Sequence, residues 1–372
     1  MKAKNSWGTT QSSSTAMRGI VSLCMVIFVA ISSVGLTFTL VTASTITAFA
    51  KTIPAKPVLT EYPTTDQPWG VSLDKHGHIW VAEPNCDASP VCGTPGPGLI
   101  ARYNTANPAS GAQNYIPPKE YNPVFLTEDA SHNVWFTDPT HNAIGELVPT
   151  TNTWTEYTAP TPNAAPYDLL LDNNGNIWFT EILADQIGFF NPSTHAFAET
   201  ATPSAGSAPY GITMNSRGNI WFAENGLPQI ANFMPTSNGK GITIKEIAID
   251  SGSGAPTPHL ITTDSQGNIW YSEGFAGQVG VFNPVTKSHT DYPVSVGVTQ
   301  THISGIGVTS TGQVWFNDSL SARIGRLTPS TGKVFAIQLK FNGAHPHDGL
   351  TIDANNHVWI TEQFGLNLGQ IS

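Results

Sequence analysis

Four histidines and one aspartate are the residues with which this sequence could do chemistry. His345, His347 and Asp348 stand together in the run AHPHDG, and His259 and His302 open the two preceding copies of a sequence repeat. Imidazole is the side chain best suited to take or give a proton near neutral pH, and it is also a common metal ligand. These residues therefore predict an acid–base or metal-binding site; solvated surface histidines are the alternative.

The repeat is anchored by a tryptophan inside a short apolar run that ends in a carboxylate. The runs read IWVAE, VWFTD, IWFTE, IWFAE, IWYSE, VWFND and VWITE. Their tryptophans are Trp80, Trp135, Trp178, Trp221, Trp270, Trp315 and Trp359. Five of the six gaps between these tryptophans fall in the forties, which is the length of one propeller blade.

The third copy shows how one unit is built. The pattern predicts two strands, residues 169–172 and 177–181, joined by the tight turn Asn173, Asn174 and Gly175. It predicts two further strands at residues 186–190 and 196–200. Four strands in each of seven copies predict an all-β fold, a seven-bladed β-propeller. The last copy breaks off after its third strand, so we expect the segment 57–63 to supply the fourth and close the ring.

Strand direction predicts which side chains meet. In a hairpin the start of the first strand lies opposite the end of the second, so the residues that open each blade and the carboxylates that end each tryptophan run should line one mouth of the channel. Those carboxylates are Glu83, Asp138, Glu181, Glu224, Glu273, Asp318 and Glu362. A carboxylate present in every blade is expected to be a turn-former, but Glu273 and Glu362 stand beside histidines and, with Asp318, remain site candidates.

The residues that open the blades divide into two groups. Trp69, Val124, Tyr167 and Tyr210 open blades one to four and are expected to pack at the rim, whereas His259, His302, His345 and His347 break the pattern in blades five to seven. Departures from a repeat are expected at functional sites. Because blades five to seven are neighbours, the histidines should cluster on one side of the mouth. No role is predicted for the histidines in or near the hairpin turns of the opposite face, which are His76, His78, His132 and His357.

The first fifty residues differ from the rest. Basic residues precede an apolar stretch, residues 20–43, and an A-x-A pattern ends at Ala50, which predicts a signal peptide over residues 1–50. The stretch is also long enough to remain as a membrane anchor. The chain is expected to be secreted or otherwise extracytoplasmic, with residues 51–372 as one propeller domain, and to meet a membrane only if the segment stays uncleaved.

Charge and cysteine content narrow the partners. Removing residues 1–50 takes away three of the 16 basic residues and leaves 13 against 26 acidic ones, a formal charge of −13. That sign argues against nucleic acid, so a small molecule bound at the channel mouth is the expected partner, and a closed ring is expected to be monomeric. Cys86 and Cys92 are expected to form one disulfide in an oxidising compartment, with free thiols as the alternative.

The repeated text PYGIT, G-x-I-W-F-T-E and IG-x-(x)-NP resembles the streptogramin B lyases, the virginiamycin B lyase family, over residues 57–372. The resemblance implies a seven-bladed ring with its active site at one mouth. It also implies that two histidines, opening blades six and seven, act with two glutamates that hold a magnesium ion. Such an enzyme opens a cyclic depsipeptide by elimination rather than by hydrolysis.

The match of site residues is partial. His347 follows Pro346 as the blade-seven histidine should, and Glu362 stands where one metal-binding glutamate would. The other glutamate is replaced by His345. In blade six His302 is displaced, with Ser304 at the aligned place, and His259 carries the PH-x-I-T text one blade early.

These departures bear on the metal and on the reaction. Magnesium prefers oxygen ligands, so His345 would weaken it and favour zinc or another transition metal. With the lyase chemistry retained, His347 would be the base that removes the proton α to the ester carbonyl, Glu362 and a metal would stabilise the enolate, and His302 would be the acid or the orienting partner. The alternatives are a non-catalytic propeller that binds a ligand or a partner, a structural module, and a lactonase-like hydrolase.

Overall fold

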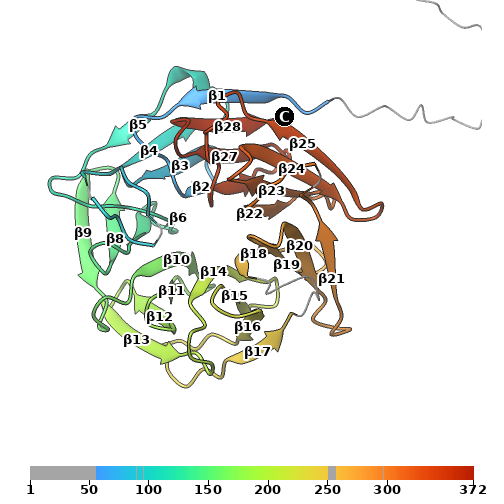
Figure 1. Ribbon diagram of the computed structural model, residues 1–372. Coiled ribbons are helices and arrows are strands. Elements are labelled where there is room, and N and C mark those ends of the chain that lie inside the picture. Colours follow the sequence, from blue (N-terminus) through green and yellow to red (C-terminus); the bar gives the residue numbers. More distant parts are fainter. Residues whose placement is uncertain (1–55, 89, 95, 250–256, 296) are drawn as a thin grey trace, which may run out of the picture. The chain divides into compact units, whose positions relative to one another are not determined.

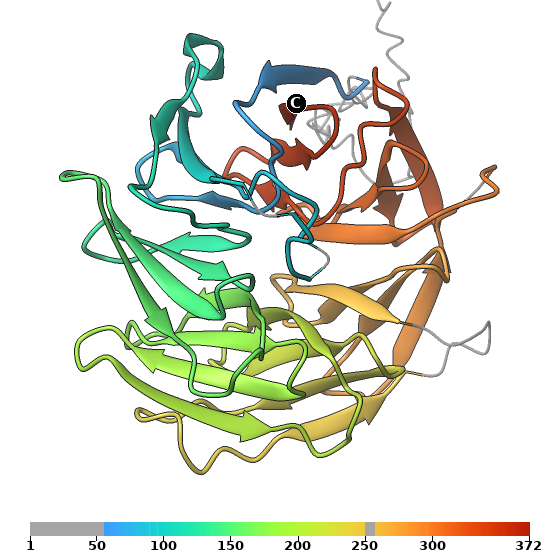
Figure 2. The same cartoon turned by 60° about the vertical axis from the view of Figure 1, so that its left-hand side comes forward.

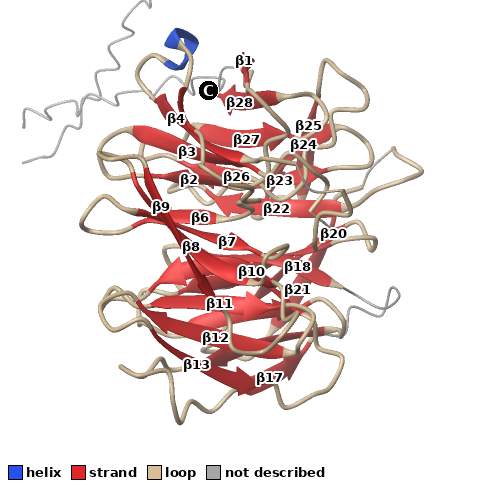
Figure 3. Cartoon of the chain, turned by 90° about the vertical axis from the view of Figure 1, so that its left-hand side faces the viewer, coloured by secondary structure: helices blue, strands red, loops and turns tan. Residues whose placement is uncertain are grey.

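The chain forms a ring of seven β-sheets around a central channel (Figure 1). The structure, a computed structural model, describes residues 56–372 apart from residues 89, 95, 250–256 and 296. Within these residues there are 28 strands and one 3₁₀ helix, η1 (Pro108–Ser110), so nearly all regular structure is strand (Figure 3). The predicted all-β, seven-bladed propeller with four-stranded blades is confirmed.

The first four blades each use four consecutive strands. Blade one contains β2 (Val71–Leu73), β3 (His78–Glu83), β4 (Leu99–Asn104) and β5 (Gln113–Tyr115). Blade two contains β6 (Leu126–Glu128), β7 (Val134–Asp138), β8 (Ala143–Val148) and β9 (Thr153–Thr158). Blade three contains β10 (Pro166–Leu171), β11 (Ile177–Glu181), β12 (Gln186–Asn191) and β13 (Ala196–Ala201). Blade four contains β14 (Pro209–Met214), β15 (Ile220–Glu224), β16 (Gln229–Phe233) and β17 (Lys245–Ala248).

The remaining blades complete the ring. Blade five contains β18 (Pro258–Thr263), β19 (Ile269–Glu273), β20 (Gln278–Phe282) and β21 (His289–Pro293). Blade six contains β22 (Ile303–Val308), β23 (Val314–Asp318), β24 (Arg323–Thr328) and β25 (Lys333–Gln338). Blade seven contains β26 (Leu350–Ile352), β27 (Val358–Glu362), β28 (Asn367–Ile371) and, as its outer strand, β1 (Leu59–Pro63).

Strand β1 closes the ring as the sequence predicts. It pairs antiparallel with β28, with Leu59 opposite Ile371, and the two segments lie side by side in Figure 1. Residues Lys56–Ser372 form one compact unit. The predicted signal peptide, residues 1–50, and the alternative anchor, residues 20–43, lie outside the described residues. Among the helices of the described part, none has the length and apolar character needed to cross a bilayer.

The repeated text has a local physical basis in the hairpin turns. In blade three one carboxylate oxygen of Asp172 accepts hydrogen bonds from the backbone N–H groups of Asn174 and Asn176, and the other accepts from Nε1 of Trp178. Gly175 takes a φ of 77°, which costs a residue without a Cβ little. One aspartate therefore fixes both the turn and the tryptophan, and the contact to the tryptophan recurs in blades two, five and seven.

A bulge at the start of the innermost strands sets the channel lining. In blade three Pro166 pairs with Glu181, but the next pair is Leu169 with Phe179, so two residues on β10 oppose one on β11. The same shift occurs in blades four, five and six. Bulges of this kind re-aim side chains. They stand where the blade-opening residues begin the innermost strands. Figure 2 shows the same ring of sheets from another side.

Candidate functional site

Three buried histidines meet at one mouth of the channel. His259 lies in β18, His302 directly precedes β22 and His347 precedes β26, so each opens one of three adjacent blades. Each offers a ring nitrogen, and these nitrogens lie within 4.8 Å of one another. The three residues are 5%, 8% and 8% exposed. The ring thus brings together the histidines that the sequence singled out.

Asp348 is the carboxylate at the centre of this cluster. Its Oδ2 accepts hydrogen bonds from the hydroxyl groups of Tyr210 at 2.8 Å and Tyr167 at 3.1 Å. Its Oδ1 lies 3.0 Å from Nδ1 of His347 and 3.1 Å from Nε2 of His259. Burial alone would raise the pKa of Asp348, but the two histidines outweigh it and hold that pKa well below its usual range. The side chain is therefore a buried carboxylate anion.

The two histidine contacts to Asp348 are close but poorly aligned. His259 Nε2, His347 Nδ1 and Asp348 Oδ1 are all buried without a well-formed hydrogen bond. Nδ2 of Asn225 faces Nδ1 of His259 at 3.3 Å, and an amide nitrogen can only donate, so the proton of His259 is on Nε2. Nδ1 of His347 lies 3.0 Å from Oδ1 of Asp348, and in a neutral imidazole a proton on Nδ1 that faces this carboxylate leaves Nε2 as the acceptor.

The remaining histidines are held neutral. The pKa of His302 is lowered to about 2, mainly by burial and secondly by the neighbouring His259 and His347. Burial is also the main cause that lowers the pKa values of His259 and His345. A neutral imidazole has one lone pair, so His302 and His345 can accept a proton or bind a metal, whereas the lone pair of His259 already faces Asn225.

His302 and His345 are each fixed by a hydrogen bond at Nδ1. Ser319 Oγ lies 3.1 Å from Nδ1 of His302, and Gln363 Oε1 lies 2.8 Å from Nδ1 of His345. The candidate Asp318 acts on the backbone instead, since its Oδ1 accepts from N–H of His302 while its Oδ2 pairs with Arg323 at 2.9 Å. Asp318 therefore positions His302 and lies in an ion pair.

A row of stacked rings crosses the mouth over blades five to seven. The ring centroids of neighbours in the row are 4.7 to 5.2 Å apart. The row consists, in order, of Phe364, His345, His347, His302 and Phe275. The two phenylalanines at its ends are 43% and 72% exposed. Exposed aromatic rings beside a buried polar cluster are typical of a ligand-binding mouth.

The acid that ends each tryptophan run lies opposite the start of the blade-opening strand, as strand direction predicts, since Pro166 pairs with Glu181 and Pro258 pairs with Glu273. Glu181, Glu273 and Glu362 are fully buried, and each lies beside a second acidic residue of its own blade. The pKa of Glu181 is raised to about 8, that of Glu273 to about 8 and that of Glu362 to about 7. Burial is the largest cause in each case, and the neighbouring acid is the second. The neighbours are Glu199, Asp291 and Glu61, respectively.

This pairing decides how Glu362 is interpreted. Both of its carboxylate oxygens are buried without a hydrogen bond, but so are both oxygens of Glu181 and Glu224 in blades whose mouths carry no histidine. Burial and a nearby second acid raise the pKa of Glu181, Glu224 and Glu362 alike, so the unpaired oxygens of Glu362 do not by themselves indicate a metal site. Within the described residues, no group of three or more potential ligands joins Glu362 to the histidines.

The donor set at the mouth suits some metals and not others. The clustered ligands are the three imidazoles of His259, His302 and His347, and the nearby carboxylate of Asp348 already contacts two tyrosines and two histidines. Magnesium requires oxygen ligands in octahedral geometry, so these residues do not fit it. Nitrogen-rich sites suit zinc and other transition metals.

Cys86 and Cys92 are joined by a disulfide, with 5.6 Å between their Cα atoms. The loop that they close belongs to blade one but reaches the mouth, because the carbonyl oxygen of the buried Ala88 accepts a hydrogen bond from Tyr167 at 3.3 Å. The loop therefore contacts a residue that also holds Asp348.

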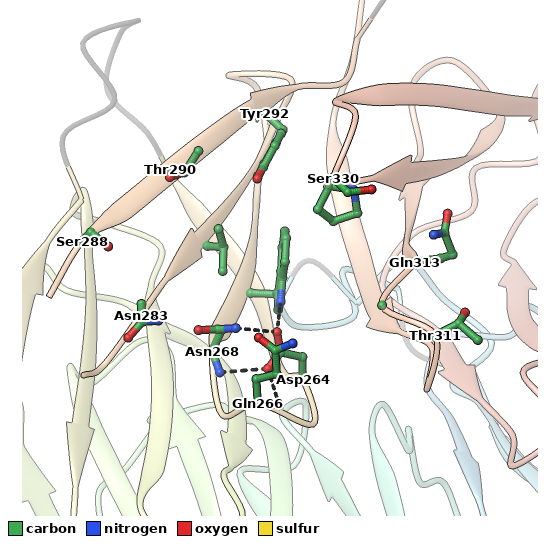
Figure 4. Close-up of a pocket in the computed structure, with 14 residues that line it drawn as sticks. Asp264, Gln266, Asn268, Asn283, Ser288, Thr290, Tyr292, Thr311, Gln313 and Ser330 are labelled. Atoms are coloured by element: carbon green, nitrogen blue, oxygen red, sulfur yellow. Dashed lines mark hydrogen bonds between the residues drawn. The ribbon is translucent and has the colours of Figure 1, made fainter. Parts of the chain in front are cut away.

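Two hollows are found in the described part of the ring, and only the first reaches the site, through Asp348. A central cavity of about 1090 Å³ is lined by Asp348 and also by Asp168; burial raises the pKa of Asp168 to about 7. A groove of about 400 Å³ lies between blades five and six, where Asp264 accepts hydrogen bonds from Asn268 and Trp270 (Figure 4). None of the sequence-predicted site residues lines this groove.

Sequence reasoning missed the two tyrosines of the site. From the sequence, Tyr167 and Tyr210 were expected only to pack at the rim. In the structure their hydroxyl oxygens lie 2.6 Å apart and both contact Asp348. The available signal was their position, since they open neighbouring blades in the same place as His259. A narrow channel brings residues of blades three and four within reach of blade seven.

Comparison with known proteins agrees with this architecture. Residues 96–371 match the Virginiamycin B lyase family. A structure of streptogramin B lyase superposes with a TM-score of 0.72 at 23% identity, covering 85% of this chain and 97% of that one. Virginiamycin B lyase from Staphylococcus aureus superposes with a TM-score of 0.70 at 26% identity, covering 85% and 99%.

A further structure is of a catalytically inactive histidine-to-alanine variant of the Staphylococcus aureus enzyme with quinupristin. It gives a TM-score of 0.71 at 25% identity, covering 85% of this chain and 99% of that one. Comparison with curated proteins gives no match. The family match spans most of the chain and the same seven-bladed ring underlies the structural matches, so this chain belongs to the virginiamycin B lyase family.

Proposed function

We propose that the protein is a carbon–oxygen lyase that opens a cyclic ester or depsipeptide by elimination, with His347 as the general base. The observation that carries this proposal is the pairing of His347 Nδ1 with the Asp348 carboxylate at 3.0 Å. It leaves the other nitrogen, Nε2, as an acceptor. A histidine oriented by a buried carboxylate is an established arrangement for a base.

The proposed step balances without water. Nε2 of His347 takes the proton from the carbon next to the substrate carbonyl, and the C–H electron pair forms a carbon–carbon double bond. The C–O bond at the next carbon breaks, and the ester oxygen leaves as a carboxylate. His302, whose ring centroid is 5.2 Å from that of His347, is the proposed orienting partner, because its lowered pKa leaves the ring neutral and unable to act as an acid.

A metal is part of the proposal only in a restricted form. His259, His302 and His347 could hold a transition-metal ion such as zinc only in a form in which the lone pair of His347 binds the ion, so metal binding by this triad and base catalysis by His347 are alternatives. Glu362 and His345 are not assigned to it, because Glu362 lies with Glu61 and His345 is engaged by Gln363.

The relatives support the substrate class. The inactive Staphylococcus aureus variant lacks a histidine and has quinupristin bound, which agrees with a histidine as the reacting group. In this chain the exposed Phe275 and Phe364 flank the histidine row and would contact the apolar parts of a large cyclic compound. We therefore propose a cyclic depsipeptide with apolar side chains as substrate.

The test is incubation of the full chain with quinupristin, followed by mass spectrometry. Elimination gives a ring-opened product of unchanged mass, whereas lactonase-like hydrolysis adds the mass of one water. His347→Ala should abolish turnover, while the matched control His357→Asn, which alters a turn histidine paired with Asp353, should not. Addition of water, or equal turnover by His347→Ala, contradicts the proposal.

The row of rings also favours a second function, which is ligand binding without reaction. A propeller of this kind would bind the compound at the mouth and return it unchanged. Binding that Phe275→Ala and Phe364→Ala both weaken, with no product from the wild type, would support this alternative over the lyase.

Export and monomeric state belong to the proposal. The composition of residues 1–50 and the disulfide between Cys86 and Cys92 favour an oxidising, extracytoplasmic compartment. Cell fractionation of the full chain, with protein sequencing of its N-terminus, separates a secreted product that begins after Ala50 from one anchored through residues 20–43. Light scattering of the purified protein gives the oligomeric state.

A further inference from the structure

A second cluster of potential metal ligands lies at the hairpin turns of blades one and two. His76, Glu128 and His132 each offer one ligand atom, and these atoms lie within 4.8 Å of one another. Nδ1 of His132 is 3.4 Å from Oε1 of Glu128, and the rings of His76 and His132 are 4.4 Å apart in an edge-to-face arrangement. All three residues line the central cavity. From the sequence alone the two histidines were given no role.

Two of the three residues depart from the repeat. Glu128 is the last residue of β6, and the equivalent position is apolar in five other blades, where it holds Leu73, Leu171, Met214, Val308 and Ile352. His132 has a φ of 66°, and the equivalent turn position in five other blades is a glycine with a φ between 77° and 84°. Those glycines are Gly77, Gly175, Gly218, Gly267 and Gly312.

Each departure has a cost that the fold does not require. A carboxylate in the place of an apolar side chain loses hydration, and burial accordingly raises the pKa of Glu128. A histidine in the left-handed region is less favourable than glycine. Side chains that carry such costs and point at one another are expected at a binding site.

We propose that His76, Glu128 and His132 form a zinc site at the turn face of blades one and two. Two imidazoles and one carboxylate are a ligand set that zinc accepts, with a fourth position left for water. Atoms bound to one zinc ion lie about 3.4 Å apart, given bonds of about 2.0 to 2.1 Å. The exposed rings of His76 and His132 can close the remaining distance by rotation about their side-chain bonds.

The charge around the cluster also suits a cation. Asp74 and Asp129 lie in the same two turns and line the same cavity, against one opposing cation, Lys75. The site is separate from the histidine row at the mouth, because it uses none of the residues that open the blades. It does not depend on the proposed lyase activity, so either proposal can fail alone.

The experiment measures zinc bound to the full-length protein after dialysis against zinc sulfate, together with a calorimetric zinc titration. Glu128→Leu and His132→Gly restore the residues that other blades carry, so both variants should fold. Each is expected to bind one zinc ion fewer than the wild type. His357→Asn changes a histidine of the equivalent turn in blade seven and should bind as the wild type does.

A separate control variant tests whether the histidines at the mouth contribute to the zinc measured. His347→Ala should keep the zinc ion that Glu128→Leu loses, whether or not the mouth binds an ion of its own. Cobalt in place of zinc gives a second readout, since tetrahedral coordination produces a visible absorption band that Glu128→Leu should remove. Equal zinc stoichiometry in the wild type, Glu128→Leu and His132→Gly would overturn the proposal.

Discussion

The hydroxyl group of Tyr210, in blade four, donates a 2.8 Å hydrogen bond to Oδ2 of Asp348, in blade seven. The contact crosses the channel mouth and ties two blades that are not neighbours in the ring. Tyr167 of blade three adds a second donor to the same oxygen. The carboxylate that orients His347 is thus held from the opposite side of the ring.

The first prediction concerns this cross-ring contact. Tyr210→Phe removes a donor from a buried anion, and hydrogen bonds to charged groups contribute about 1.5–3 kcal/mol. The free energy of unfolding should fall by about that amount in urea denaturation. Tyr62→Phe is the control, because the Tyr62 hydroxyl group donates to the neutral amide of Gln370 at 3.1 Å. A smaller loss for Tyr210→Phe than for Tyr62→Phe would contradict the prediction.

The second prediction concerns Asp348 as a positioning residue. Asp348→Asn keeps the shape of the side chain but removes the charge that faces Nδ1 of His347, so His347 can adopt the wrong tautomer. Turnover should fall by about 10²- to 10⁴-fold, the range of general acid–base catalysis, and substrate affinity should stay within a few fold. Measurement of kcat and KM separately checks this, because loss of folding or of the mouth would weaken binding as well.

The fold was predictable because most blades repeat a similar local turn and the same tryptophan strand. The turn aspartate, the positive-φ glycine and the tryptophan of blade three act within a few residues of one another, as Asp172, Gly175 and Trp178 show. Closure of the ring by residues 57–63 could also be predicted, because the last copy of the repeat supplies three strands and leaves the outer partner of β28 to come from elsewhere. Local signals of this kind can be recognised from the sequence without knowledge of the tertiary structure.

The site was predictable only in part, because it depends on contacts between distant blades. Clustering of His259, His302 and His347 followed from blade order. The burial of Glu362 beside Glu61 did not, since Glu61 is 301 positions away in the chain and joins blade seven only through ring closure. The departures of Glu128 and His132 from the repeat are visible in the sequence, but their proximity to His76 depends on the packing of blades one and two and was not predicted.

The third prediction concerns the disulfide loop. Cys86 and Cys92 close a short loop, so their bond should contribute about 2 kcal/mol through the entropy of the unfolded chain. The double substitution Cys86→Ser and Cys92→Ser should lower the unfolding free energy by about that amount and also weaken ligand binding, because Ala88 contacts Tyr167. Reductant should reproduce both effects in the wild type and change nothing in the double variant.

The fourth prediction is that the protein loses stability as the pH rises above neutral. Buried acids of six blades have a raised pKa in the folded protein, to about 8 for four and to about 7 for two. They are Glu83, Glu181, Glu224, Glu273, Glu156 and Glu362. Between their ordinary pKa near 4.5 and these values the folded chain holds protons that the unfolded chain has released, so the unfolding free energy falls with rising pH.

The buried histidines act in the opposite sense and over a different range. The pKa values of His259, His302 and His345 are lowered from 6.5, so the unfolded chain gains protons below that value and stability falls as the pH drops through it. Above pH 6.5 the buried acids are the groups among these whose protonation changes, so the melting temperature should fall from pH 6.5 to pH 9.

One variant isolates the contribution of a single acid pair. Glu181→Gln replaces the carboxyl group that shares a proton with Glu199 by an amide, which needs no proton to donate a hydrogen bond. Its melting temperature should therefore exceed that of the wild type at pH 8.5, and the difference should vanish or reverse at pH 5. The exposed Glu120→Gln, which also removes one negative charge, controls for net charge and should leave the pH profile unchanged. Parallel profiles for the wild type and Glu181→Gln would show that this pair does not hold its proton in the folded state.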